Sequence, residues 1–138
     1  MADTAEVIIT SLPSITAFDE VVGGPDGIAA SGKDGLIVCE TSTLPIEVKD
    51  RGRAQLAESG VVLLDTPLSG TGAQAVVKDL VIYASGETDA IARCTDVFNS
   101  IGRAHFDIGA FGTGSRMKFV ANLLVAIHNV ASAEAVVL

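Results

Sequence analysis

The sequence predicts an α/β fold in which a parallel sheet is flanked by helices and a long apolar helix ends the chain. Three observations support this prediction. Short apolar runs rich in β-branched residues recur along the chain, and segments with helical periodicity separate them. Strands and helices alternate at the spacing of βα units, which favours parallel strands covered by helices. Hydrophobic residues make up 49% of the chain and charged residues 19%, which is typical of a folded domain.

The first half of the chain contains three expected strands with two helices between them. Apolar residues recur at helical spacing from Ile15 to Val22, after a Ser14 cap and before a pair of glycines. A second helix starts at Pro45, a residue favoured in the first helical turn, and Gly60 stops it. The three buried strands are expected at residues 6–10, 36–39 and 61–65.

The second half continues the alternation. A loop of hydroxyl residues and glycines spans 66–72, and a short helical turn follows at 73–77. Thr88 is expected to cap a single helix that ends at Gly102. The two strands of this half are expected at residues 79–84 and 104–108.

The last helix begins after the stretch Gly112-Thr113-Gly114, where Ser115 is the expected cap. Lys118 and Asn122 are four residues apart, so both project from one face of an otherwise apolar helix. In one interpretation Lys118 only extends its ammonium into water and Asn122 is merely exposed. In the other, Lys118 is partly desolvated and exchanges a proton with a substrate hydroxyl.

Charge and composition exclude several classes of partner. The chain has 9 basic and 17 acidic residues, a net charge of −8, and no basic run, which disfavours nucleic acid and anionic membranes. The final helix carries Asn122, His128 and Glu134 among other polar residues, which a membrane span seldom tolerates. Two cysteines far apart in sequence, without a Cys-x-x-Cys motif, favour a reduced, cytoplasmic protein.

Four sequence blocks resemble the β-hydroxyacid dehydrogenases, the family that includes 3-hydroxyisobutyrate dehydrogenase. The blocks occur in the family's order and cover essentially the whole chain. They are the strand and turn Val7-Ile8-Ile9-Thr10-Ser11-Leu12-Pro13, the turn Glu40-Thr41-Ser42-Thr43, the loop Asp65-Thr66-Pro67-Leu68-Ser69-Gly70, and the helix from Gly112 through Lys118 and Asn122 to Ala133-Glu134-Ala135.

The resemblance implies a Rossmann-type fold, a nicotinamide cofactor (NAD or NADP) and a small 3-hydroxy acid as substrate. Lys118 would transfer the proton and Asn122 would bond the substrate hydroxyl. The Lys118 ammonium is expected to face the Ser69–Gly70 corner at the carboxyl ends of the strands. By residue type, hydroxyl and backbone donors in a tight loop suit a carboxylate, and a base near a carbinol suits hydride transfer. The implied substrate-binding residues are Ser69, Gly70 and Thr71, and the implied cofactor-binding residues are Leu12, Pro13, Ser42 and Thr43.

The chain also departs from the family pattern. Thr71 replaces the second glycine of the family's Ser-Gly-Gly, Lys78 stands where glycine is common, and Ala121 replaces a frequent Asn. The 6-phosphogluconate branch has a different residue set around its lysine and is ranked lower.

The 138 residues hold no Gly-x-Gly-x-x-Gly motif of the kind that binds the pyrophosphate of a dinucleotide. The expected organisation is therefore the later part of a Rossmann-type domain at residues 1–108 and the start of a long interdomain helix at 109–138. An internal piece of an enzyme of this kind is expected to bind dinucleotide poorly and to catalyse little when isolated.

The sequence supports a hydrolase or a metal site less well than a dehydrogenase. A hydrolase triad of Ser69 with His105 or His128 is disfavoured, because no Gly-x-Ser-x-Gly elbow is present. His105 and Asp107 lack a third ligand, so no metal site is expected. A noncatalytic module that acts by association, or a different Rossmann-like ligand-binding domain, remains an alternative. Self-association through an unpaired edge strand and the terminal helix is expected in either case.

Overall fold

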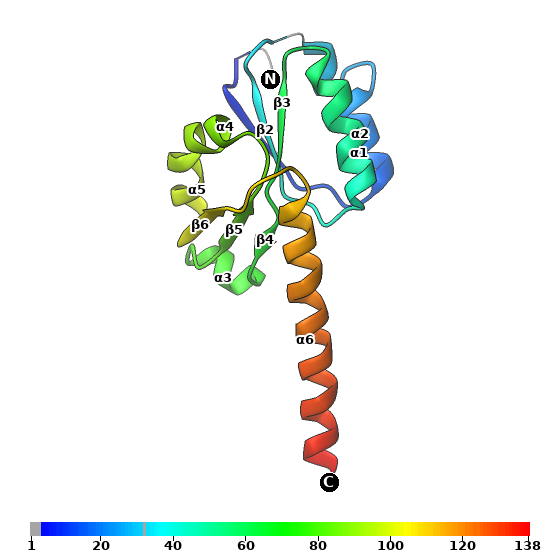
Figure 1. Cartoon of the computed structure of the whole chain (residues 1–138), viewed down its shortest axis with the longest axis vertical. Helices are drawn as coiled ribbons and strands as arrows, with labels where there is room; N and C mark the ends of the chain where they lie inside the picture. Colours follow the sequence, from blue (N-terminus) through cyan, green and yellow to red (C-terminus); the bar gives the residue numbers. More distant parts are fainter. Residues whose placement is uncertain (1–3, 32) are drawn as a thin grey trace.

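The structure is a computed structural model that describes residues 4–31 and 33–138. Figure 1 shows a layered α/β body from which one long helix projects. The predicted fold class, a sheet flanked by helices with a long apolar helix at the end, is confirmed. The strands are β1 (Val7–Thr10), β2 (Ile37–Glu40), β3 (Val62–Asp65), β4 (Leu68–Ser69), β5 (Val81–Ala84) and β6 (Ala104–Asp107). The helices are α1 (Ile15–Gly23), the 3-10 helix η1 (Ile28–Ser31), α2 (Ile46–Ala57), α3 (Gly72–Val76), α4 (Thr88–Arg93), α5 (Thr95–Ile101) and α6 (Thr113–Val137).

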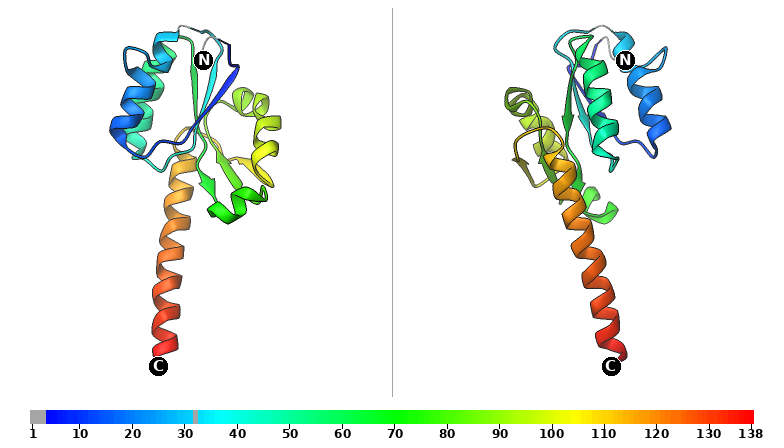
Figure 2. Two further views of the ribbon diagram at one scale, coloured as in Figure 1. Left: turned by 180° about the vertical axis from the view of Figure 1, so that it is seen from behind. Right: turned by 45° about the vertical axis from the view of Figure 1, so that its right-hand side comes forward.

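The first three strands form a parallel sheet in the order β1-β2-β3. Their alternating side chains separate two hydrophobic clusters. Val38 and Leu63 pack with α1 and α2, whereas Ile37 and Leu64 face α4 and α5. Figures 1 and 2 show these helix pairs on opposite sides of the strands. Burial on both faces is the reason that β2 and β3 are continuous apolar runs, whereas Ile9 of the edge strand β1 is exposed.

The second sheet differs from the expectation. The predicted loop at 66–72 contains β4, which pairs antiparallel with β5, while β5 and β6 are parallel. Parallel neighbours need a crossover of about a dozen residues or more, usually a helix that returns the chain to its starting edge. The five-residue α3 instead reverses the chain, so β5 runs back along β4. An antiparallel bridge between Asp65 and Ser85 joins the two sheets.

Two helix boundaries also differ from the prediction. The single helix expected from Thr88 is two helices, because the chain bends at Cys94. Glu87, rather than Thr88, occupies the cap position. Ser14, by contrast, caps α1 as expected and accepts a hydrogen bond from the Ala17 amide.

Helix α6 is packed only at its beginning. Gly114 and Ser115 are buried, and from Asn122 to Leu138 every residue is exposed in the described chain. By length and composition α6 is one helix that could cross a membrane, which is weak evidence by itself. The polar residues that it carries, among them Asn122, His128 and Asn129, argue against such a span.

Candidate active site at the carboxyl ends of the strands

The candidate site lies where the parallel strands end and α6 begins. Thr10, Glu40 and Asp65, the last residues of β1, β2 and β3, are in register across the sheet. All three are buried, and Glu40 and Asp65 are fully so. The predicted site loops that follow these strands therefore emerge at one edge of the sheet, as expected for ligand sites in such folds. In Figure 1 this edge is the lower end of β2 and β3, beside the first turn of α6.

Asp65 is the centre of a buried polar network. Its Oδ1 accepts hydrogen bonds from the Lys49 ammonium at 2.8 Å and from the Ser115 hydroxyl at 2.8 Å. Its Oδ2 accepts from the Ser115 backbone N–H at 2.7 Å and from the Ser85 hydroxyl at 3.2 Å. The side chains of Lys49 and Asp65 are both fully buried. The carboxylate thus has a cation and three neutral donors, which together offset its desolvation.

This network corrects the prediction for the start of α6. Gly112, in the left-handed conformation with a φ of 86°, precedes the helix. Ser115 was expected to cap the helix with its own side chain, but its hydroxyl donates to Asp65 and its N–H is capped by the same carboxylate. The negative charge at the helix N-terminus is favourable, because the first turn presents unpaired N–H groups and a positive dipole end.

Lys118 lies one turn further along α6. Its ammonium donates to the carbonyl oxygen of Leu68 at 2.6 Å, and the side chain is half-buried. The structure thus brings Lys118 beside Leu68, the first residue of β4, and Ser69 is the second residue of that strand. Asn122 lies a further turn along the same face and is exposed. An ammonium has three donors, so the bond to Leu68 leaves others for a bound ligand.

The predicted substrate-binding residues form the corner between β4 and α3. Ser69 is half-buried and Gly70 is exposed. Gly70 has a φ of 139°, and an added Cβ would lie 2.6 Å from Leu80 Cδ2, so the position requires glycine. Thr71 caps α3 in a capping box with Gln74, which uses its hydroxyl within the loop. Because the Thr71 N–H and hydroxyl both bond Gln74, the predicted anion donors of this corner are reduced to those of Ser69 and Gly70.

The predicted cofactor-binding residues come together at the ends of β1 and β2. The Ser42 hydroxyl accepts from the Leu12 N–H at 2.6 Å, which ties the two loops to each other. The Ser42 N–H donates in turn to Glu40 Oε1 at 2.7 Å, and the Thr10 hydroxyl donates to Glu40 Oε2. Pro13 and Thr43 are exposed at this edge. The two ordered loops leave the Leu12–Pro13 turn and the Thr43 hydroxyl at the surface of this edge. Such groups fit a nicotinamide dinucleotide that would lie along the edge.

The sequence-based prediction missed one contributor to the site, Lys49, and placed Gly114 only in the turn before the last helix. Lys49 lies on the buried face of α2, between Val48 and Gly52, and a charged residue on that apolar ridge was the available signal. An added Cβ at Gly114 would lie 2.5 Å from the Tyr83 carbonyl and 2.9 Å from that of Asp65. Glycine at this position lets α6 approach the strand backbones, which the Gly-x-Gly motif did not reveal by itself.

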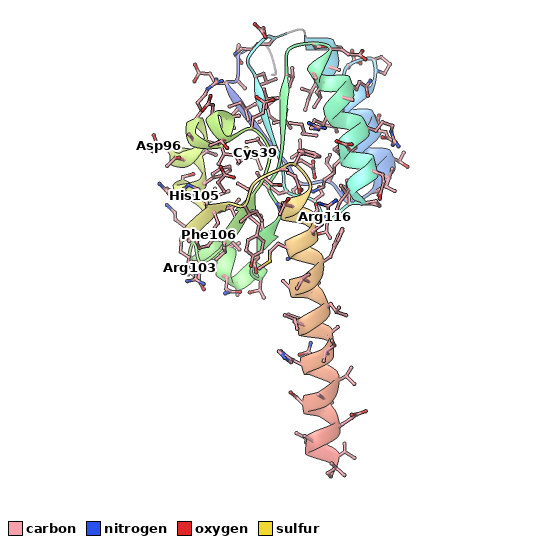
Figure 3. All side chains as sticks on the ribbon, in the orientation of Figure 1. Cys39, Asp96, Arg103, His105, Phe106 and Arg116 are labelled. Carbon is pink, nitrogen blue, oxygen red and sulfur yellow. The ribbon has the colours of Figure 1, made fainter. Side chains whose placement is uncertain are left out.

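The other chemical candidates lie away from this edge or are engaged in packing. His105 packs its ring against Phe98 at 5.3 Å, and Figure 3 shows it on β6. His128 is exposed on α6. Cys39 and Cys94 are both buried thiols, and Cys39 donates to Cys94 across 3.7 Å. This bond and burial raise the pKa of the Cys39 thiol, which makes it a poor nucleophile. In residues 4–31 and 33–138 no group of three metal-ligating side chains is found.

Comparisons with known proteins identify relatives across the whole chain. L-threonate dehydrogenase from Cupriavidus necator is 30% identical over 100% of this chain and 47% of its own length. The mitochondrial 3-hydroxyisobutyrate dehydrogenase of Mus musculus is 32% identical over 98% of this chain and 40% of its own. The chain thus spans about half the length of the curated relatives it matches.

A solved structure shows the same fold. Psf3 in complex with NADP+ and 2-OPP superposes with a TM-score of 0.90 at 23% identity, over 98% of this chain and 48% of that one. The family model of the NAD binding domain of 6-phosphogluconate dehydrogenase matches residues 1–114. Its description, an NAD binding domain, confirms the predicted class of cofactor, a nicotinamide dinucleotide. The hydroxyacid dehydrogenases among the relatives confirm the predicted resemblance. This chain therefore belongs to the family of the NAD binding domain of 6-phosphogluconate dehydrogenase.

Proposed function

We propose that the protein containing this chain is an oxidoreductase that transfers hydride between a nicotinamide cofactor and a small 3-hydroxy acid. The observation that carries this proposal is the 2.6 Å hydrogen bond between the Lys118 ammonium and the Leu68 carbonyl, directly before Ser69. This bond supports the proposal, because it holds the Lys118 ammonium next to the residue that precedes the proposed carboxylate donors. The nicotinamide, when bound, supplies the hydride acceptor or donor.

Lys118 is proposed to move the proton of the substrate hydroxyl. Hydride leaves a carbinol carbon readily only as the hydroxyl proton is removed, so a base must lie within hydrogen-bond reach. Neutral Lys118 takes that proton during oxidation, and its ammonium returns one during reduction. Asn122, one turn away on the same face, is proposed to bond the hydroxyl oxygen and orient it.

Ser69 and Gly70 are proposed to bind the substrate carboxylate, with Thr71 shaping the corner. The pairing of Leu68 with Ile82 and of Ser69 with Val81 holds this corner on the second sheet. The carboxylate would accept from the Ser69 hydroxyl and the Gly70 N–H. Two charge-assisted hydrogen bonds of this kind fix both the position and the orientation of the acid.

Residues 1–108 are proposed to supply the cofactor side and residues 109–138 the catalytic helix. Leu12, Pro13, Ser42 and Thr43 would contact the dinucleotide at the ends of β1 and β2. Hydrogen bonds from Leu12 to Ser42 and from Ser42 to Glu40 support this assignment, because they hold the two turns in one arrangement. Preorganised turns of this kind lower the entropy cost of binding.

The test is turnover by the complete protein that contains this chain, assayed with NAD, NADP and a panel of 3-hydroxy acids. Lys118→Ala is expected to lower kcat by a factor of about 10² or more while the protein stays folded by circular dichroism. Arg116→Ala is the matched control, because Arg116 is an exposed cation two residues away on α6. Its turnover should stay within about twofold of the unchanged protein, as expected for a surface residue. Full turnover in Lys118→Ala would remove the proposed mechanism.

The alternative is a noncatalytic module, and the same assay separates it from an enzyme. A complete protein that neither binds a nicotinamide dinucleotide nor oxidises any acid in the panel would favour the module. For the isolated 138-residue chain we expect weak dinucleotide binding and little turnover.

Self-association is proposed in addition. β1 is an edge strand with Ile9 44% exposed, and the apolar side chains along α6 are exposed from Phe119 onwards. Unpaired strand edges and large apolar surfaces favour association. Light scattering of the chain at high concentration should show a dimer or larger species. The buffer should contain a reductant, because Cys39 and Cys94 are free thiols. A monomer at every concentration would contradict this proposal.

A further inference from the structure

Two hydrogen-bonded contacts connect α6 to the chain that leaves β3. Asp65 binds Ser115 through both carboxylate oxygens, and Leu68 binds Lys118 through its carbonyl. The spacing is three residues on each side, from 65 to 68 and from 115 to 118. The contact between Asp65 and Ser115 therefore fixes the rotation of α6 about its axis and its position along that axis. The contact between Leu68 and Lys118 then holds the Lys118 ammonium in place.

The Lys49 ammonium supplies the counter-ion of Asp65 in this buried position. The two side chains are fully buried and 2.8 Å apart, and Lys49 comes from α2, an element that contributes no residue to the proposed chemistry. A buried carboxylate without its cation would be strongly disfavoured and would draw water or a different partner into the site. The position of Asp65, and with it the first turn of α6, depends on the charge at position 49.

The substrate corner is held by a different set of contacts. β4 pairs with β5 through Leu68 and Ser69, and α3 is closed by its own capping box. None of these contacts involves Asp65 or Lys49. A change in the ion pair should therefore move Lys118 relative to Ser69 and Gly70 without dismantling the corner that those two residues form.

We propose that Asp65, held by the Lys49 ammonium, is a positioning residue that sets Lys118 against the substrate corner. This inference depends on the proposed role of Lys118. Neither Asp65 nor Lys49 touches substrate; both act through the first turn of α6. The expected signature is a loss of kcat with little change in the KM for the hydroxy acid, because a misplaced proton-transfer group slows the chemical step while the carboxylate site is kept.

The experiment compares Lys49→Met with the double variant Lys49→Met/Asp65→Asn in the complete protein, assayed well below each variant's own Tm. Lys49→Met leaves a buried charge unpaired, so it should lower both the Tm and, by about tenfold or more, kcat. The double variant buries no charge and should recover much of the Tm. Its amide keeps one oxygen for the Ser115 N–H and the Ser85 hydroxyl, but its NH2 group cannot accept from the Ser115 hydroxyl as Asp65 Oδ1 does. The negative charge at the start of α6 is also lost, so kcat should stay low.

Leu56→Ala is the matched control, because it destabilises α2 from a fully buried position seven residues from Lys49. Its Tm should fall while kcat and KM stay near those of the unchanged protein. A double variant that recovers kcat together with Tm would overturn the inference, since the ion pair would then serve stability alone. Unchanged kcat in Lys49→Met would also overturn it. If Lys118→Ala itself keeps full turnover, the proposed function fails instead, and the two failures are thereby distinguished.

Discussion

Two buried carboxylates lie side by side at the carboxyl edge of the sheet, and they organise two parts of the candidate site differently. The catalytic corner is the region of Lys118, Ser69 and Gly70, and the cofactor corner is the pair of turns that contain Leu12 and Ser42. Glu40 on β2 is in register with Asp65 on β3, and neither is accessible to solvent. Glu40 accepts from the Thr10 hydroxyl and the Ser42 N–H, and in the described part of the chain it forms no ion pair. Asp65 has the Lys49 ammonium in addition to its neutral donors.

The difference follows what each carboxylate holds. Glu40 orders the turn that directly follows it, two residues away in sequence. Asp65 holds the first turn of α6, which the chain reaches fifty residues later. The local turn is held by hydrogen bonds from neutral donors to the Glu40 carboxylate, whereas the distant helix is held by a carboxylate that also pairs with a buried cation. The accuracy of the catalytic corner thus depends on an ion pair, and that of the cofactor corner does not.

The largest expected effect separates the two carboxylates by stability. Asp65→Ala should lower the free energy of unfolding by about 3–5 kcal/mol, because it leaves the Lys49 ammonium buried without a counter-ion. Glu40→Gln should cost only about 1–2 kcal/mol, because it keeps the shape of the side chain and weakens only the hydrogen bonds from two neutral donors, the Thr10 hydroxyl and the Ser42 N–H. Urea unfolding measures both. Equal losses would show that the two corners are anchored alike.

The next effect concerns how closely α6 approaches the strands. Gly114→Ala should destabilise the protein by about 1–3 kcal/mol and lower kcat, because the new methyl group meets backbone atoms that cannot move aside. Gly72→Ala is the matched control at the start of α3, where an added Cβ has nothing within 4 Å. Thermal unfolding of the two variants is the measurement. A Gly114→Ala protein as stable as the Gly72→Ala protein would contradict the close seating of α6.

A smaller effect is expected at the cofactor corner. Ser42→Ala removes the acceptor of the Leu12 N–H and should cost about 1 kcal/mol of stability. It should raise the KM for the nicotinamide cofactor while kcat changes little, because the turn loosens but Lys118 stays in place. Steady-state kinetics at saturating hydroxy acid provides the test. A fall in kcat without a change in that KM would mean that the two corners are not independent.

The smallest effect lies outside both corners. Lys78 follows α3 with a φ of 57°, an unfavourable conformation for a residue with a side chain. Lys78→Gly should stabilise the protein by up to about 1 kcal/mol, since the relief of strain exceeds the entropy that glycine loses. Differential scanning calorimetry would detect the rise in Tm. Turnover should be unchanged, so an altered kcat would show that the connection from β4 through α3 to β5 also affects the catalytic corner.

Much of the fold was predictable because burial leaves a direct trace in the sequence. The runs at β2 and β3 are continuously apolar since both faces are covered, and Ser14 and Gly60 mark helix ends by local chemistry. The direction of β5 was not predictable in this way. An apolar run has the same composition in either direction, and a short helix such as α3 can reverse the chain or continue it.

The candidate site divides along the same line. Lys118 and Ser69 could be named from the motifs that carry the family resemblance, and in the structure Lys118 contacts Leu68, the residue before Ser69. Their proposed roles remain predictions. The helix cap supplied by Asp65 was missed, because capping by a residue fifty positions away leaves no pattern in the local sequence. Lys49 did leave a signal, a charge on a buried helical ridge, and that signal indicates an unseen partner.

The proposed function requires that the Lys118 ammonium and the Ser69–Gly70 corner together hold one small hydroxy acid. A crystal structure of the complete protein with 3-hydroxyisobutyrate bound tests this requirement. The carboxylate is expected within hydrogen-bond distance of Ser69 Oγ and the Gly70 N–H, with the hydroxyl beside Lys118 Nζ. A substrate bound elsewhere, or a Lys118 side chain directed away from Leu68 while the acid occupies the corner, would contradict it.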